Sequence, residues 1–156
     1  ELTKALLEAG AAAADAGAAE IIIPATLQDS LAARLERLGA AKRLAQAKLV
    51  REFVDRLLAA EPQAQVVVLG DLNESETSPA VAAFGAPPLV NLVSRVADED
   101  RYSFNFEGAG EIIDHIVVSP ALAGGAEADI VHLNTNCPDS KRLSDHDPVV
   151  ARLRSD

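Results

Sequence analysis

The stretch at residues 66–73, VVVLGDLN, constrains the fold most strongly. Its run of apolar, mostly β-branched residues predicts a core strand buried on both faces, because neither face keeps the polar alternation of a half-solvated strand. Gly70 permits a change of direction, and Asp71 and Asn73 would project to one side of an extended chain. The strand end is therefore either a metal or phosphate site, or a turn in which both side chains bond their own backbone. Taken alone, the stretch slightly favours the turn.

Length and charge limit the classes of function. The 156 residues correspond to one ordinary domain, and 49% hydrophobic content allows a sizeable core. A net charge of −10 argues against a surface that attracts nucleic acid by basic residues. A polyanionic substrate would need help from divalent cations, so the acidic balance is compatible with a metal-dependent phosphoesterase.

The chain carries few signals of its location. Cys137 is the single cysteine and cannot form an internal disulfide. No stretch approaches the roughly 20 apolar residues that a membrane span needs, and residues 1–17 lack the basic start of a signal peptide. We therefore expect no membrane span and no signal peptide in the given chain.

The first third of the chain is predicted to be helical. Residues 1–20 are rich in alanine and favour a helix, and residues 21–23 form a short strand or an apolar plug before Pro24. Apolar residues recur at three- and four-residue steps over 31–58, which predicts an amphipathic helix, with an interruption near Gly39 as an alternative. A helix that leads through a short polar turn into a buried strand is an α/β unit.

The second half is predicted to contain mostly strands. Residues 102–106 alternate, residues 107–110 form a turn, and residues 112–119 are apolar, which predicts a hairpin between the first and last of these segments. Residues 129–133 and 148–153 predict two further short strands.

Two polar spots interrupt these strands. Asp114 and His115 lie within an apolar strand, and because an unpaired buried carboxylate is costly, Asp114 should have a charged or hydrogen-bonding partner. The run SDHDP at 144–148 directly precedes the last strand. Its proline restricts the preceding residue to an extended conformation, which helps to fix the direction of Asp145 and His146. Each spot alone is a weak signal.

Together and in this order, the motifs are more specific. GDLN at 70–73, YS at 102–103, IDHI at 113–116 and SDHDP at 144–148 resemble the endonuclease/exonuclease/phosphatase superfamily, which has the deoxyribonuclease-I-like fold. The nearest likeness is to bacterial extracellular nucleases. The resemblance covers residues 42–153.

The resemblance implies a role for each motif residue. Asp71 would orient and deprotonate the attacking water, and Asn73 would hold that water or a phosphate oxygen. Asp145 would help to bind Mg²⁺, Mn²⁺ or Ca²⁺ through oxygen. His146 would donate a hydrogen bond or a proton to the phosphate, and Asp114 would orient His146 and raise its pKa.

Other polar residues have weaker assignments. Tyr102 and Ser103 would lie near the substrate, although an ordinary structural role on a strand is equally compatible with the sequence. We expect His115 to pack or to support the site without taking part in catalysis, and His132 and Asn134, at a strand end, to be structural.

By the same resemblance, the fold is an α/β (α+β) structure that forms half of a four-layer α/β/β/α sandwich. Residues 1–41 would be a helical amino-terminal segment and residues 42–156 the carboxy-terminal half of the domain. The Asn, metal-binding Glu and second His that the superfamily places in its amino-terminal half have no matching motif. We expect the open face to be covered by self-association, by an amino-terminal half or by residues 1–38.

The expected function is metal-dependent, nuclease-like phosphodiester hydrolysis, with nucleic acid or another phosphodiester as substrate. The alternatives are an impaired remnant or binding module of the same fold, and a phosphomonoesterase or lipid phosphodiesterase. The likeness to extracellular nucleases implies an extracellular or periplasmic location.

Overall fold

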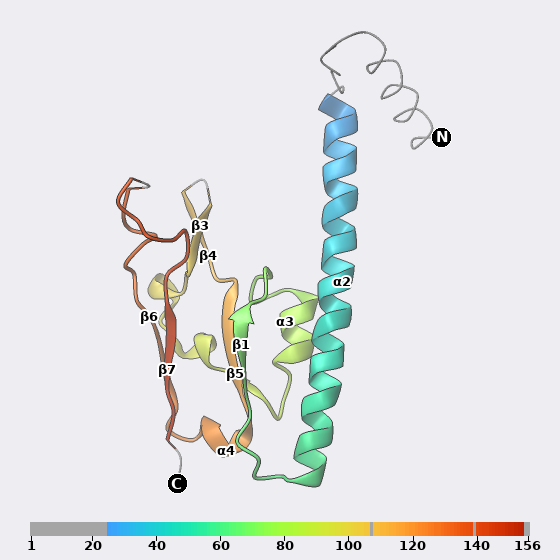
Figure 1. Ribbon diagram of the computed structural model, residues 1–156, viewed down its shortest axis with the longest axis vertical. Coiled ribbons are helices and arrows are strands. Elements are labelled where there is room, and N and C mark those ends of the chain that lie inside the picture. The colour runs from blue at the N-terminus through green and yellow to red at the C-terminus, as the bar shows by residue number, and fades with distance from the viewer. Residues whose placement is uncertain (1–24, 107, 139, 155–156) are drawn as a thin grey trace. The chain divides into compact units, whose positions relative to one another are not determined.

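The computed structural model describes residues 25–106, 108–138 and 140–154 (Figure 1). The predictions for residues 1–20 and 21–23 lie outside these ranges. The chain divides into two units, Glu1–Leu38 and Gly39–Asp156. The described part of the first unit is helical, and the second unit contains every strand described below.

Helix α2 spans Ala25–Ala60 without the interruption considered at Gly39. A glycine inside a helix costs only about 1 kcal/mol, which a sequence rich in Ala, Leu, Arg and Glu tolerates. Within the second unit, Val54 of this helix is buried against the sheet. Arg51 donates hydrogen bonds to the carbonyl oxygens of Ala86 (2.7 Å) and Pro87 (2.9 Å), which ties the helix to the segment after α3 (Pro79–Phe84).

The central sheet has the strand order β1 (Val67–Asp71), β5 (Asp114–Val118) and β2 (Val90–Asn91), with both pairs antiparallel. The β1–β5 register places Asp71 opposite Asp114. Side chains directly opposite each other in such a pair lie on the same face. The register therefore places these two carboxylates together at one end of the sheet.

Two small antiparallel sheets complete the strands: β3 (Phe104–Phe106) with β4 (Ala109–Glu111), and β6 (Glu127–Ile130) with β7 (Val149–Arg152). Helix α4 (Pro120–Ala123) follows β5, and two short 3₁₀ helices span Leu92–Arg95 and Asp98–Asp100.

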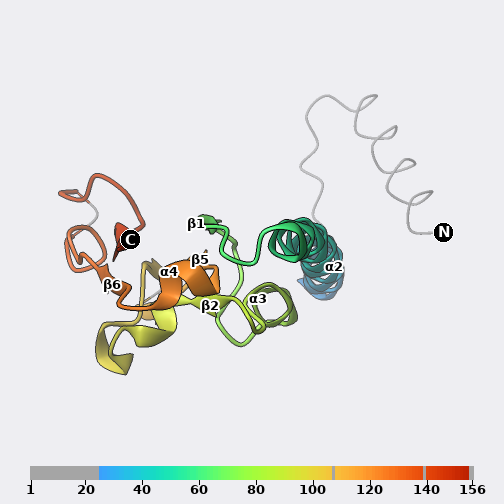
Figure 2. The same cartoon turned by 90° about the horizontal axis from the view of Figure 1, so that it is seen from below.

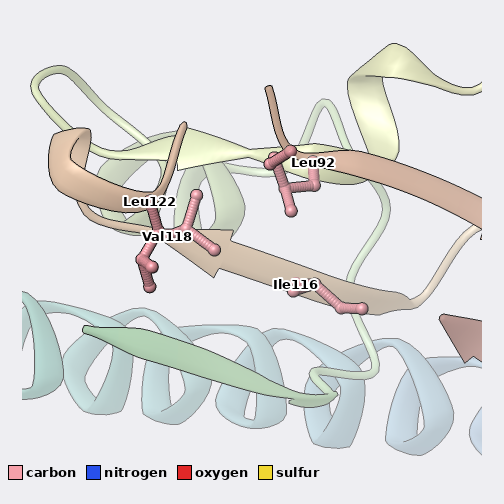
Figure 3. Close-up of a cluster of buried hydrophobic side chains, with 5 residues drawn as sticks. Leu92, Ile116, Val118 and Leu122 are labelled. Carbon is pink, nitrogen blue, oxygen red and sulfur yellow. The ribbon is translucent and has the colours of Figure 1, made fainter. Parts of the chain in front are cut away.

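The central sheet buries a different core on each face. Ile116 and Val118 of β5 pack with Leu92 and Leu122 on the face toward β7, and Figure 3 shows this cluster. Val117 points to the opposite face and packs with α2 and α3. Within the second unit, Figure 2 shows α3 and the part of α2 after Leu38 on one side of the strands β1 and β5, and β6 on the other side. The β5 strand is buried on both faces because one of these two clusters covers each face.

The prediction that residues 66–69 are buried on both faces is wrong. Val67 and Leu69 are exposed, Leu69 by 67%. In the described part of the chain β1 is an edge strand, and on this face the core cluster joins β5 to Val149 and Ala151 of β7 without reaching β1. The face of β1 that carries Val67 and Leu69 is therefore not covered by the described residues.

The predicted hairpin has the wrong partner. Phe104–Phe106 pairs with Ala109–Glu111, whereas Asp114–Val118 pairs with β1 and β2 in another sheet. Gly108, with a φ of 87°, lies in a tight turn, so Phe104–Phe106 pairs with the residues directly after this turn. The chain then leaves the hairpin through Ile112 and Ile113.

The remaining predictions agree with the structure more closely. The mixture of helices with small antiparallel sheets confirms the α+β class. The strands predicted at 129–133 and 148–153 appear as β6 and β7, with β6 shifted toward the amino terminus, so His132 and Asn134 lie in the loop after it. None of the helices described is both long and apolar enough to span a membrane.

Candidate active site

His146 and Asp114 form the centre of the polar cluster. Nδ1 of His146 lies 2.7 Å from Oδ2 of Asp114, and the hydroxyl of Ser103 donates to the same oxygen at 2.6 Å. Asp114 is the first residue of β5, and His146 reaches it because an isolated β-bridge pairs His146 with Phe104. With Nδ1–H directed at the carboxylate, Nε2 is the nitrogen left for a ligand.

The surroundings of His146 favour its charged form. Partial burial lowers the pKa of His146, but the hydrogen bond to Asp114 and the negative charges of Asp114, Asp71 and Asp145 outweigh it, so the pKa is raised above 6.5. Three carboxylates thus act on one imidazole. Such a histidine stays protonated to higher pH than a free one and can donate to an anion.

Asp71 and Asn73 form a compact turn at the end of β1. Oδ1 of Asp71 accepts from the backbone N–H of Asn73 at 2.8 Å, and Oδ2 accepts from its side-chain amide at 3.1 Å. Asn73 has a φ of 50°, in the left-handed region that Asn tolerates better than most residues. The backbone hydrogen bond that the turn alternative expects of Asp71 is therefore present, whereas the amide of Asn73 bonds a side chain and not the backbone. Both side chains are nevertheless exposed, and each carboxylate oxygen keeps a second lone pair.

A cleft of about 200 Å³ is lined by Asp114 of β5, the partner of His146, and by Gly70 of β1, the residue before Asp71. Its lining also includes Leu69 of β1, Asp147, which precedes β7, and Val149, the first residue of β7. The cleft therefore opens on the face of the sheet that carries Asp114. This is also the face on which the register places Asp71.

Asp147 organises the loop that carries His146. Its buried carboxylate accepts from the backbone N–H groups of Asn134 (2.7 Å) and Thr135 (3.1 Å), from Nδ1 of His132 (2.9 Å) and from the Thr135 hydroxyl. Burial raises the pKa of Asp147, but these donors, led by Thr135 and His132, lower it to about 2. The carboxylate therefore stays ionised throughout the neutral range and holds residues 132–135 in place.

The backbone around His146 is fixed on both sides. The carbonyl of His146 accepts from the side-chain amide of Asn134 at 2.7 Å, and its N–H donates to the hydroxyl of Ser144 at 3.0 Å. The N–H of Asp147 donates to the carbonyl of Ser103 at 2.7 Å. Ser103 thus bonds both Asp114 and the residue after His146.

The loop after Asn73 is held at Glu74. The carbonyl of Glu74 accepts from Nε2 of the buried His115 at 3.0 Å, and its carboxylate pairs with Nε of Arg43 at 2.6 Å. Since a carbonyl can only accept, His115 carries its proton on Nε2, and Nδ1 accepts from Asn91. His115 is therefore packed inside the protein and helps to hold the loop after Asn73.

The two residues expected near the substrate differ in position. Ser103 is fully buried and holds Asp114, so it does not face solvent. Tyr102 is half-buried, stacks on His132 with ring centroids 4.1 Å apart, and donates to Asn136 at 3.2 Å. In this arrangement Tyr102 braces the loop that Asp147 organises.

The described residues supply a divalent cation with an incomplete set of ligands. Within 25–106, 108–138 and 140–154, no group of three or more His, Cys, Asp or Glu side chains is placed to hold a metal. Asp145 is exposed and close enough to raise the pKa of His146. Magnesium uses one or two carboxylates together with water and substrate phosphate, so Asp145 is available as a single ligand.

Sequence reasoning missed the support provided by Asp147 and Thr135, whereas Asn134 was expected to be structural and supports the backbone of His146. The signal was present in part, because Asp147 precedes a proline in a dense polar run. Its partners, however, lie 12 to 15 residues away in a loop without regular structure.

Comparison with known families agrees with this geometry. The family model described as Endonuclease/Exonuclease/phosphatase family matches residues 33–147, which include the motifs discussed above except Pro148 at the end of the last one. The chain belongs to this family, whose members hydrolyse phosphodiester or phosphate ester bonds and typically use divalent metals. Neither the curated proteins nor the solved structures give a significant match.

Proposed function

We propose that this protein is a metal-dependent phosphodiesterase of the nuclease type. The observation that supports the proposal most directly is the Asp114–His146 pair, in which the imidazole is fixed through Nδ1 and three carboxylates favour its charged form, so that its pKa is raised. A histidine that favours its charged form and bonds Asp114, which lines a cleft, is suited to an anionic phosphate. Hydrolysis of a phosphate ester requires stabilisation of charge on the phosphoryl oxygens.

In the proposed reaction each residue of the site has its own role. Asp71, on the same face of the sheet as Asp114, orients and deprotonates the attacking water, and Asn73 holds that water or a phosphate oxygen. His146 donates from Nε2 to a non-bridging phosphate oxygen. Asp114 keeps the imidazole oriented and favours its protonated form, and Ser103 keeps Asp114 in place.

A divalent cation completes the proposal. When bound, it would polarise the phosphate, and Asp145 would provide one of its oxygen ligands. The remaining ligands would come from water, substrate or parts of the protein beyond the described residues. The dependence on metal is therefore a separate expectation, which is tested by comparing activity with a divalent cation and with EDTA.

Cleavage of supercoiled plasmid DNA tests the function. The unmodified protein is assayed with Mg²⁺, with Ca²⁺ and with EDTA, beside His146→Ala, Asp145→Ala and the exposed control Asp100→Asn. The proposal predicts metal-dependent nicking by the unmodified protein and Asp100→Asn, and at least about 100-fold less by His146→Ala.

The other outcomes distinguish the alternatives. Equal nicking by all variants would reveal a contaminant and remove the residue assignments. A folded protein that cleaves no DNA but hydrolyses a phosphomonoester or a lipid phosphodiester would assign another substrate class of the family. A folded protein that hydrolyses none of these substrates would be a binding module.

A further inference from the structure

A row of aromatic rings leads away from His146 along β3. The ring of Phe104 lies 4.9 Å from that of His146, measured between centroids, and the ring of Phe106 lies 6.4 Å from Phe104 with planes inclined by only 16°. Phe104 and Phe106 are two positions apart on one strand and therefore point to the same face. The row is continuous with the catalytic histidine.

The outer ring of this row is open. Phe106 is 56% exposed, and its cross-strand partner is Ala109, whose methyl group cannot cover a phenyl ring. An isolated exposed Phe needs no explanation, but here the open ring continues a row that begins at the reacting end of the site. Its surroundings therefore point to a ligand attached to the scissile phosphate.

Charge indicates which part of a substrate would lie there. Glu111 is the cross-strand partner of Phe104 and is exposed on the same face, so this surface repels a phosphate backbone. The net charge of −10 adds to this repulsion of phosphate. A neutral planar group is the part of a nucleotide that such a surface accepts. Aromatic rings bind nucleobases by stacking, and this contact is tolerant of sequence.

We propose that Phe104 and Phe106 form a stacking surface for an unpaired nucleobase next to the scissile phosphodiester, which makes single-stranded nucleic acid the preferred substrate. This inference rests on the proposed function. Bases in a duplex have their faces covered by neighbouring bases, so only an unpaired base can use the exposed ring. A hydrocarbon chain gains most from an enclosing pocket, which a single open strand does not provide.

Binding of a short fluorescein-labelled oligothymidylate, measured by fluorescence anisotropy, tests the surface. The measurements use the full chain with Asp71→Asn to prevent cleavage, and circular dichroism verifies that each variant is folded. Phe106→Ala should weaken binding about 5- to 100-fold, whereas Phe106→Tyr, which keeps the planar face, should bind like the parent. Phe106→Leu, which keeps apolar area without a ring, should bind like Phe106→Ala.

Two further readouts separate stacking from a general structural effect. Because the contact is to a base, Phe106→Ala should leave the dependence of binding on salt concentration unchanged. In the Asp71-containing protein, the ratio of single-strand to duplex cleavage should fall with Phe106→Ala. Val150→Ala, which shortens an exposed apolar side chain on β7, is the matched control and should change neither quantity.

Contrary results are equally definite. Binding by Phe106→Leu equal to that by Phe106→Tyr, or duplex binding as strong as single-strand binding, would overturn the stacking surface. DNA cleavage with no effect of Phe106→Ala on binding would leave the proposed function standing and remove this inference. Binding that depends on Phe106, without any cleavage, would leave the stacking surface standing and remove the proposed function.

Discussion

Asp71 on β1 and Asp114 on β5 lie directly opposite each other in the antiparallel register, yet their carboxylates have different partners. Asp71 is exposed and, among the residues that the structure describes, bonds only Asn73, two residues along the same turn. Asp114 is partly buried, and its Oδ2 accepts from both Ser103 and His146. The carboxylate of Asp71 is thus open to solvent, which suits a general base. The carboxylate of Asp114 is hydrogen-bonded to His146, which suits a group that orients the histidine.

The turn at Asn73 allows its backbone and side-chain roles to be separated. Asn73→Gly keeps access to the φ of 50° and should retain stability, whereas Asn73→Ala should lose about 1 kcal/mol from the strain of the left-handed conformation. Both variants lack the amide and should cleave DNA about 100-fold more slowly. Urea denaturation and kcat/KM measure the two effects. Full activity of Asn73→Gly would show that the amide has no part in the reaction.

The carboxylate of Asp147 should make the fold sensitive to acid. Its pKa is about 2 in the folded protein against 3.8 as the reference, so its stabilisation is present above pH 3.8 and is lost as the pH falls toward 2. This difference corresponds to about 2 kcal/mol. Thr135→Val removes the leading donor that lowers this pKa and should move the loss to higher pH. Urea unfolding from neutral pH down to about pH 2 measures the shift; identical pH profiles for both proteins would contradict the account.

His115 provides a test of how the loop after Asn73 is held. Replacing the buried imidazole by Phe keeps most of the volume but leaves the Glu74 carbonyl without its donor, which should cost about 1–3 kcal/mol. His115→Gln can restore a donor and should recover part of this loss. Unfolding free energies of the two variants make the comparison. Equal stability of His115→Phe and the unmodified protein would show that the hydrogen bond contributes nothing.

The motifs predicted the site better than the pattern of apolar residues predicted the sheet. Asp114 was expected to have a partner because a carboxylate inside an apolar strand is costly, and His146 provides that partner. The run at 66–69 was expected to be buried on both faces because it lacks polar alternation. That expectation is wrong, because a pattern of residues does not reveal which neighbours cover a face. The exposure of Leu69 follows from the edge position of β1, a property of topology.

The remaining differences arise from tertiary contacts. The apolar segment at 112–119 looked like the second strand of a hairpin, but Asp114–Val118 gains more by pairing between β1 and β2, where both of its faces are covered. Asp147 looked like a residue that merely precedes a proline. Its four donors come from a loop whose path the sequence does not reveal.

The pH dependence of kcat/KM for DNA cleavage, compared between the unmodified protein and Asp114→Asn, tests the central claim that a cationic His146 acts on the phosphate. The pKa of His146 is raised above 6.5, so activity should fall only as the pH rises past that raised value. Asp114→Asn removes the hydrogen-bonded negative charge and should move this fall to lower pH, in step with the imidazole titration followed by NMR. An alkaline fall that stays at the same pH in both proteins, while the NMR titration of His146 moves, would contradict the account.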